Sequence, residues 1–424
     1  MVDMHKLMER LYPLCRSLTG NGNRATLAVL KETVDGLRTY EIPTGSRVGD
    51  WIVPDEWNCK GGWIKDESGT RIVDFTESNL HVMGYSTPTD AWLTLDELKP
   101  HLYSLPDHPD WVPYVTSYYQ RRWGFCLADK VLKKLKPGRY HAFIDSTLEP
   151  GSLTLADAVL TGETQEEIFF STYICHPSMA NNELSGPCVA AALYDWLKDL
   201  PRRRYTYRFA FAPETIGAIA YISRNLQALK AYVAAGFNLT CVGDDRAWSY
   251  MPSRRGNTLA DRVALNMLRA QHPDFTAYSY LQRGSDERQY CAPGVDLPFC
   301  SVMRSKYAAY PEYHTSADDL SLVTADGLAG TLAFFQDVIG VLESNATYRT
   351  TTVGEPQLGR RGLYPTLSYF GSIGEAVRNM MNLLSYADGT LDIIGISDAI
   401  GVSAKALAHM ACQLEREGLL ERMS

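Results

Sequence analysis

The sequence predicts an α/β protein built from a three-layer domain with a mainly parallel sheet, an inserted β-rich domain and a C-terminal winged-helix-like helical domain. Three observations support this. Strand-like and helix-like segments alternate from about 150 to 345, short strand-like runs with hairpin turns fill 41–149, and three short helical segments follow residue 355. We therefore expect an α/β domain of residues 1–40 and 150–350, an insert of 41–149, and a C-terminal domain of 355–424.

The α/β domain is expected to begin with two amphipathic helices within residues 3–36. Its strands are expected at EEIFFSTYIC (166–175), YTYRFAFAP (205–213), AAGFNLTCVG (234–243) and LPFCSVM (297–303). Its later helices are expected at GPCVAAALYDWLKDL (186–200), TIGAIAYISRNLQAL (215–229), LADRVALNMLRAQ (259–271) and ADGLAGTLAFFQDVIGVLES (325–344). Strands that alternate with helices form parallel sheets, whose reactive groups sit on loops beyond the carboxyl ends of the strands.

The insert has the texture of a small β domain with an aromatic core of its own. Its short alternating runs are separated by Gly, Pro and the turn Asp-Glu-Ser-Gly at 66–69. It also holds six of the eight tryptophans, at positions 51, 57, 63, 92, 111 and 123. Because the chain enters and leaves it early, we expect the insert to lie over the cleft of the α/β domain. Such a lid would suit a small substrate or a chain end.

The C-terminal segment is expected to form helices at EAVRNMMNLLSYADG (375–389), DIIGISDAIGV (392–402) and AKALAHMACQLEREGLL (404–420). The second and third, joined through Gly-Val-Ser, resemble a helix-turn-helix followed by a wing. Residues 355–424 carry six Lys/Arg against eight Asp/Glu. Because a DNA-reading module should be basic, this balance favours a structural or protein-contacting winged helix. A homo-oligomer or a protein partner through this domain stays open.

The composition is that of a globular protein, with 45% hydrophobic and 21% charged residues among 424. The formal charge of −8 argues against general binding to nucleic acid or anionic membranes. Nine scattered cysteines without a CxxC pair indicate buried free thiols in a reducing cytoplasm. The first residues lack a signal-peptide core, and no apolar run approaches the roughly 18 residues of a spanning helix. We expect a cytoplasmic protein without a membrane partner.

Polar side chains follow the expected strands of the α/β domain. His176 and Glu214 come after the first and second strands, Asp244 comes after the third, and His314 lies beyond the fourth. One histidine at a strand end is most often a packed polar residue, but two histidines together with carboxylates favour a metal site. Zinc prefers imidazole nitrogen and carboxylate oxygen, and it keeps an open position when it is catalytic. A nearby glutamate can take a proton from metal-bound water.

The order of these motifs resembles that of the co-catalytic zinc aminopeptidases, a superfamily that includes glutaminyl cyclases and the metal-free ectodomain of the transferrin receptor. More narrowly, the chain resembles bacterial proteins with an aminopeptidase-like domain that are often associated with polysaccharide biosynthesis. The motifs that carry this narrower resemblance are YICHPSMANNELSG, APETIGAIAYISRN, TCVGDDR, GSDERQY, YHTSADDL and the tail PQLGRRGLYPTLS. The resemblance covers nearly the whole chain and implies a zinc-peptidase-like fold.

The resemblance also implies roles for single residues. His176 and His314 match the first and last metal-binding histidines, and Glu214 matches the general-base glutamate. Three ligand positions that carry carboxylates in the superfamily carry neutral side chains here: Asn182, Thr215 and Thr240. A two-zinc site concentrates about four positive charges within roughly 4 Å and needs carboxylates to neutralise them. We therefore expect one zinc ion or none.

A one-metal site could use His176, His314 and Asp244 as ligands, with Glu214 as the base. Asn182 would be a weak, neutral ligand or a group that positions the substrate carbonyl. Glu183 could swing in to replace the lost bridging carboxylate.

Four side chains are candidates for contacts with the substrate. Arg304 could bind a carboxylate through its bidentate fork, although an ordinary surface position is equally compatible with its place in the sequence. Asp286 could hold an imidazole in place or cap a helix. Tyr313 could position a carbonyl, and Glu183 could also face the substrate.

The favoured function is a metal-dependent, aminopeptidase-like hydrolase that acts on an amide bond of a small peptide or an amino-acyl/sugar conjugate. The alternative is a catalytically reduced pseudoenzyme or binding protein that uses the same cleft. The neutral residues at three ligand positions favour the alternative, whereas the retention of both histidines and the base opposes it. An amide-forming or cyclising transferase is a weaker reading, because only His314 remains of the ligand set that such chemistry uses.

Overall fold

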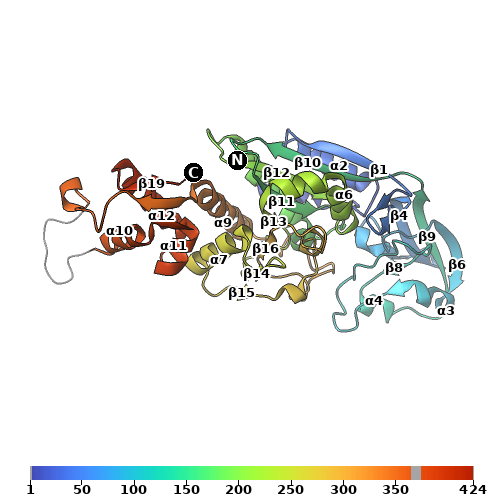
Figure 1. Cartoon of the computed structure of the whole chain (residues 1–424). Coiled ribbons are helices and arrows are strands. Elements are labelled where there is room, and N and C mark those ends of the chain that lie inside the picture. Colours follow the sequence, from blue (N-terminus) through green and yellow to red (C-terminus); the bar gives the residue numbers. More distant parts are fainter. Residues whose placement is uncertain (1, 364–373, 424) are drawn as a thin grey trace. The chain divides into compact units, whose positions relative to one another are not determined.

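The computed structural model of the chain describes residues 2–363 and 374–423. The chain divides into two compact units (Figure 1). The first comprises residues up to 256 together with 277–332, and the second comprises 257–276 together with residues from 333 onward. The tail motif noted above, at 356–368, is described only as far as residue 363.

A large mixed sheet forms the centre of the first unit. Its strand order is β1 (Arg38–Pro43), β10 (Ser152–Leu160), β12 (Thr206–Ala212), β11 (Glu167–Tyr173), β13 (Val233–Asn238), β16 (Phe299–Met303), β14 (Ser249–Met251) and β15 (Thr276–Ala277). The four central strands, β12, β11, β13 and β16, run parallel, while β1, β10 and β14 pair antiparallel at the flanks. All residues of β11 are buried, as expected when both faces of a parallel sheet are covered. The predicted parallel sheet is thus confirmed for its centre.

Helices cover this sheet. They are α2 (Asn21–Lys31), α5 (Ser185–Lys198), α6 (Ile216–Tyr232) and α8 (Glu287–Tyr290), while α1 (Met4–Leu11) packs against α5. Helix α5 packs against β11 and β12, and α6 packs against β10, β12 and β13. At Gly186, in the first turn of α5, a Cβ atom would lie 2.3 Å from the backbone oxygen of Leu239. Glycine therefore lets α5 approach the sheet closely and sets the position of the turn before it.

That turn is a short π-helix, η3 (Ala180–Leu184), which leads directly into α5. The backbone N–H groups of Leu184 and Ser185 donate to Met179 and Ala180, five residues earlier. Insertions of this kind inside α-helices often mark functional sites. All of its residues are buried, so each polar side chain in it needs a partner.

The insert contains a four-stranded antiparallel sheet of order β5 (Arg71–Asp74), β4 (Glu56–Asp66), β9 (Arg139–Glu149) and β6 (Thr89–Thr94). Its shorter elements are β2 (Arg47–Val48), β3 (Trp51–Ile52), β7 (Leu102–Tyr103), β8 (Phe125–Cys126), α3 (Leu95–Leu98) and α4 (Asp129–Leu132), with 3-10 turns at 79–81 and 99–101. The β-rich texture is confirmed. The aromatic core is not separate, however, because Trp57 and Ile144 of the insert belong to the same apolar cluster as Leu155 and Phe169 of the large sheet.

The second unit is helical with a small sheet. It contains α7 (Leu259–Gln271), α10 (Glu375–Tyr386), α11 (Ile393–Ile400) and α12 (Ala404–Arg416), and a sheet of β18 (Asp388–Asp392), β17 (Thr347–Thr350) and β19 (Leu420–Arg422). Gly401 ends α11 in the left-handed region, with φ of 72°, which makes the sharp turn into α12. The predicted helix-turn-helix is therefore present, with β19 after it at the wing position. Strands β17 and β18 were not predicted, and β18 takes up the end of the helix expected at 375–389. Two further 3-10 turns of the chain lie at 280–282 and 359–361.

Helix α9 (Ala325–Ser344) begins in the first unit and ends in the second. By length and composition, this helix could cross a bilayer. The expectation that the chain has no apolar run of that length missed it. Of its most apolar window, 56% is buried inside the structure. A buried core helix passes the same test, so α9 is weak evidence for a membrane span.

Candidate active site

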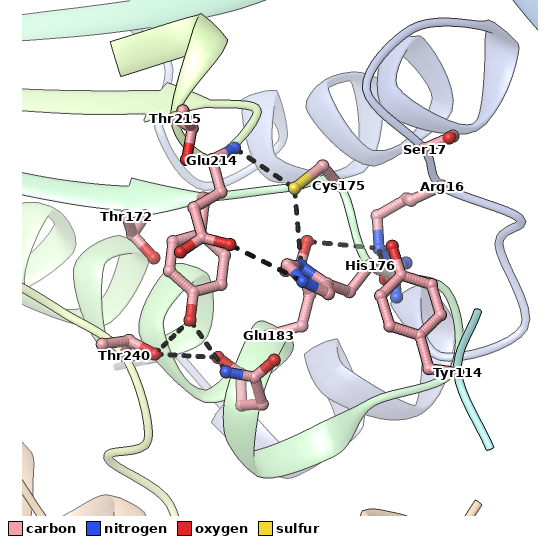
Figure 2. Close-up of polar contacts among 12 residues, drawn as sticks. Arg16, Ser17, Tyr114, Thr172, Cys175, His176, Glu183, Glu214, Thr215 and Thr240 are labelled. Atoms are coloured by element: carbon pink, nitrogen blue, oxygen red, sulfur yellow. Dashed lines mark hydrogen bonds and ion pairs between the residues drawn. The ribbon is translucent and has the colours of Figure 1, made fainter. Parts of the chain in front are cut away.

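The site is built where two neighbouring parallel strands end. Strand β11 leads through Ile174 and Cys175 to His176, and β12 leads through Pro213 to Glu214. The His176 ring is buried, and its Nε2 lies 3.7 Å from Oε2 of Glu214 (Figure 2). The backbone N–H of Glu214 donates to the Cys175 sulfur at 3.1 Å, which ties the two strand ends together. The predicted base and the first predicted ligand are therefore in contact.

A buried carboxylate holds His176 from behind. Nδ1 of His176 lies 2.7 Å from Oε2 of Glu183, which projects from the π-helical turn. Oε1 of Glu183 lies 3.8 Å from Nε of Arg16, and that Nε also donates to the backbone oxygen of His176 at 2.9 Å. Arg16 and Glu183 have no exposed side-chain surface. Glu183 thus sits behind the imidazole and not on the cavity wall, where we expected it to face the substrate.

The surroundings of the two histidines shift their pKa values in opposite directions. Burial lowers the pKa of His176, but the charge and hydrogen bond of Glu183 and the charge of Glu214 outweigh it, so the net pKa is raised. His314 lies with its ring centre 5.1 Å from that of His176. Burial, followed by the charge of His176, lowers the pKa of His314 to about 2. Nε2 of His314 is buried and has no hydrogen-bond partner among the described residues.

Aromatic rings hold His314. Tyr313 stacks on its imidazole with ring centres 3.9 Å apart, and Tyr114 meets it edge-on at 5.2 Å. His314 has a φ of 59°, an unusual conformation for a residue other than glycine, and its backbone oxygen accepts from the N–H of Tyr114. Tyr313 therefore orients a predicted ligand; nothing in the structure assigns it to a substrate carbonyl.

The half-buried base, Glu214, and the buried Asp286 influence one another electrostatically. Burial raises the pKa of Glu214, against the opposing effect of the His176 charge. Burial also raises the pKa of Asp286 well above its ordinary value, and the charge of Glu214 adds to this effect. Oδ1 of Asp286 accepts from the backbone N–H of Thr215 at 2.8 Å. Asp286 thus fixes the backbone next to the base, and its side chain is bound to a protein group.

Two of the three neutral positions, Asn182 and Thr240, belong to a cluster of hydrogen bonds with Tyr173, whereas Thr215 bonds to Asp286 and Arg288. Nδ2 of Asn182 donates to the Tyr173 hydroxyl at 2.8 Å, and that hydroxyl also bonds to Oγ1 of Thr240. Oγ1 of Thr240 donates in turn to the backbone oxygen of Asn182 at 3.0 Å. Oδ1 of Asn182 remains buried without a partner among the described residues. With no carboxylate in this cluster, two zinc ions do not fit.

Two of the expected residues lie elsewhere. The Asp244 carboxylate accepts from the backbone N–H and hydroxyl of Ser305, at 3.0 and 2.8 Å, and from Nδ2 of Asn181 at 2.9 Å. These bonds occupy it as a structural group, and it does not line the cavity that holds His176. The Arg304 guanidinium lies 4.2 Å from the ring centre of Trp248 and does not line that cavity either.

The cavity in front of His176 and Glu214 has a volume of about 400 Å³. Its floor and walls include Cys175, Thr215, Arg288, Gln289 and His314. The insert contributes Trp51, Tyr114, Thr116, Tyr118 and Tyr119, which confirms that the insert covers the cleft. Glu214 is the only acidic side chain among the described residues that line this cavity. No local pattern distinguishes Arg288 from an ordinary residue of a short helix.

The donors suit one metal ion at most. Because Glu183 occupies Nδ1 of His176, the Nε2 atom is left to face Glu214, as in metal sites where a carboxylate orients a histidine. The unpartnered Nε2 of His314 is a second nitrogen donor. Cys175, His176 and Glu183 also lie close enough to share an ion. That trio is less suitable, since burial keeps the pKa of the Cys175 thiol well above its ordinary value and Arg16 lies beside Glu183.

Comparison with known proteins shows the family to which the chain belongs. A family model described as a domain of unknown function, DUF4910, matches residues 5–345, and one described as a winged helix-turn-helix matches 346–422. A Clostridium acetobutylicum protein, provisionally named a polysaccharide biosynthesis protein with an aminopeptidase-like domain, is 39% identical over 420 residues, covering 99% of this chain and 96% of its own length.

Solved structures show the same fold. A crystal structure from Clostridium acetobutylicum, provisionally described as a peptidase, has a TM-score of 0.93 at 38% identity and covers 99% of this chain and 96% of that one. A zinc aminopeptidase from Bacillus subtilis has a TM-score of 0.57 at 11% identity, covering 78% and 92% of the two chains. Fold and site thus define an aminopeptidase-like protein. More narrowly, the chain belongs to the DUF4910 family and ends in a winged helix-turn-helix domain.

Proposed function

We propose that this protein is a hydrolase of an amide bond in a small peptide or an amino-acyl/sugar conjugate, with Glu214 as the general base. The contact between Glu214 and His176 within a single cavity carries the proposal. Desolvation raises the pKa of this half-buried carboxyl above its ordinary value, which makes it a better proton acceptor. The provisional link of the Clostridium acetobutylicum relative to polysaccharide biosynthesis supports the conjugate as a substrate class.

One zinc ion would be held by Nε2 of His176 and Nε2 of His314. When bound, such an ion polarises a carbonyl and lowers the pKa of water. Side chains of the protein would orient the ligands and transfer the proton. Glu183 orients His176, Tyr313 and Tyr114 hold His314, and Glu214 accepts and returns the proton. The aromatic side chains of the insert enclose the substrate and limit the access of water.

The test is hydrolysis by the purified protein, with and without added zinc, on a panel of aminoacyl p-nitroanilides, dipeptides and N-acyl amino sugars. Glu214→Gln should lower turnover by roughly 10²–10⁴-fold, the usual contribution of a general base. Glu163→Gln is the matched control, because Glu163 lies on the surface in an ion pair with Arg202. His176→Ala and His314→Ala should each weaken zinc binding in equilibrium dialysis. Equal turnover by Glu214→Gln and wild type would refute the assignment of the base.

A second function is favoured by the cluster of Tyr173, Thr240 and Asn182, which replaces charged ligands with neutral groups. In this alternative the cavity binds its ligand without cleaving it. The same panel distinguishes the two: a bound ligand that returns chemically intact after prolonged incubation with zinc supports a binding protein. A ligand that is cleaved only when Glu214 is present supports the hydrolase.

We also propose that the winged helix contacts protein and not DNA. The first backbone N–H of α12, that of Ala404, donates to Oδ1 of Asn266 in α7, and Lys405 pairs with Asp337 at 2.6 Å. The first turn of α12, the helix that would enter a DNA groove, is therefore bound to other residues of the second unit. Gel-shift assays on random duplex DNA at low salt should show no complex. Size-exclusion chromatography with light scattering would reveal a homo-oligomer, and deletion of the segment from residue 346 should abolish it.

A further inference from the structure

Arg288 places a guanidinium on the wall of the cavity that holds Glu214. Its Nη2 donates to Oγ1 of Thr215 at 2.6 Å, and its Nε is buried without a hydrogen-bond partner among the described residues. The positive charge of Arg288 acts to lower the pKa of Glu214 and that of Asp286. Within the described part of the chain, no carboxylate lies within ion-pair distance of it. A cavity-facing cation of this kind has donors left for a ligand.

Thr215, whose hydroxyl accepts a hydrogen bond from this guanidinium, has a strained backbone conformation. Its φ and ψ are 63° and −81°, outside the regions that a β-branched residue normally adopts. Two bonds maintain the strain, one from its backbone N–H to Asp286 and one from Arg288 to its hydroxyl. Backbone strain of this kind clusters at ligand-binding and active sites, where the surrounding structure determines it. The strained residue thus links the base, Glu214, to the guanidinium two positions past Asp286.

Aromatic rings of the insert line the same cavity as Arg288. Trp51 and Tyr119 line the same cavity with their ring centres 6.1 Å apart, and they are 39% and 56% exposed. Exposed aromatic side chains at a cavity mouth favour a ligand with an apolar or flat portion. A ligand that satisfies both features carries an anionic group and, next to it, a less polar body.

We propose that Arg288 is an anion subsite, which binds a carboxylate or phosphate group of the substrate through its guanidinium. The planar fork can donate two parallel hydrogen bonds to either oxyanion. The role of this anion in presenting an adjacent amide to Glu214 rests on the proposed hydrolase function; the binding itself does not. Acidic amides, such as N-acyl amino acids or phosphorylated N-acyl sugars, are therefore the substrate class.

Calorimetric titration of the full chain tests the subsite without requiring turnover. The probes are N-acetylphenylalanine, its neutral amide, inorganic phosphate and acetate. Wild type should bind N-acetylphenylalanine at least tenfold more tightly than the amide, and phosphate should compete if the subsite accepts any oxyanion. Competition by phosphate but not by acetate would indicate a phosphorylated substrate, and the reverse would indicate a carboxylate.

Variants then assign the effect. Arg288→Gln should remove the preference for the anionic probe, and Arg288→Lys should retain part of it, since lysine keeps the charge but not the fork. Arg283→Gln is the control, because Arg283 is exposed, precedes the helix that carries Arg288 and does not line the cavity. Equal binding of both probes by wild type, absence of binding to either, or an unchanged preference in a folded Arg288→Gln would overturn the proposal. If Glu214→Gln keeps the preference while no substrate is cleaved by wild type, the subsite stands and the hydrolase does not.

Discussion

Replacing Glu183 with glutamine should destabilise the first unit strongly. The substitution keeps the shape of the side chain and an acceptor for His176 but removes the charge that faces Arg16. At the 3.8 Å between Nε of Arg16 and Oε1 of Glu183, two unit charges attract by about 4 kcal/mol at an effective dielectric constant of roughly 20. Arg16 would then be fully buried without a counter-charge, and removing one partner of a buried ion pair typically costs about 3–5 kcal/mol.

Urea unfolding followed by tryptophan fluorescence measures this loss. All eight tryptophans lie at or before position 248, so the signal reports the unit that contains Arg16. Glu32→Gln is the matched control, because Glu32 pairs with Arg10 on the surface and its loss should leave the midpoint nearly unchanged. A midpoint for Glu183→Gln that coincides with that of Glu32→Gln would refute the reasoning.

The same variant should change the pH dependence of stability. The folded pKa of His176 is raised above its ordinary value of 6.5, so the stabilisation from its proton is present below 6.5 and is lost as pH rises through the folded pKa. Wild type should therefore lose stability as pH rises above about 6.5. Glu183→Gln should lose less over that range, because the carboxylate that raises the pKa is gone.

Three further predictions concern single side chains. His314, with a folded pKa of about 2, should cost stability as pH falls from 6.5 towards 2, and His314→Asn should flatten that acid limb; an unchanged limb in urea series at pH 4 and 7 would contradict this. Asn182→Asp should lower the melting temperature without zinc, by leaving a charge in a buried cluster, and should gain little zinc affinity on its own. Ellman's reagent should react first with Cys412, which is exposed, and slowly with buried Cys175; equal rates would show that the site opens readily.

Much of the fold follows from local patterns. The central strands are continuous apolar runs flanked by helical segments, and such a pattern needs no knowledge of distant contacts. His176 and Glu214 were predictable for the same reason, since each directly follows its strand and the register of parallel strands brings strand ends together. The flanking antiparallel strands and the core shared with the insert depend on pairings between distant segments, which periodicity does not reveal.

The surroundings of the site were predictable only in part. Arg16 lies 160 positions from the His176 backbone oxygen that it binds, and nothing in its neighbourhood distinguishes it from a surface arginine. Asp244 follows its strand as a ligand should, but Ser305 and Asn181 take its oxygens. Local sequence therefore located the charged groups near the strand ends, whereas distant partners decided which of them face the cavity.

The cluster of Tyr173, Thr240 and Asn182 bears on how this family could change over time. The Tyr173 hydroxyl bonds to both other side chains, and the Thr240 hydroxyl also donates to the backbone oxygen of Asn182, so replacing Tyr173 leaves buried polar groups of its neighbours unsatisfied. Substitutions in such a network are not independent, and the order in which they occur matters. A lineage that acquired this cluster would have to cross less stable intermediates to regain carboxylates at positions 182 and 240. The reduced site is in this sense entrenched, and selection would more readily adapt its neutral chemistry than restore its charges.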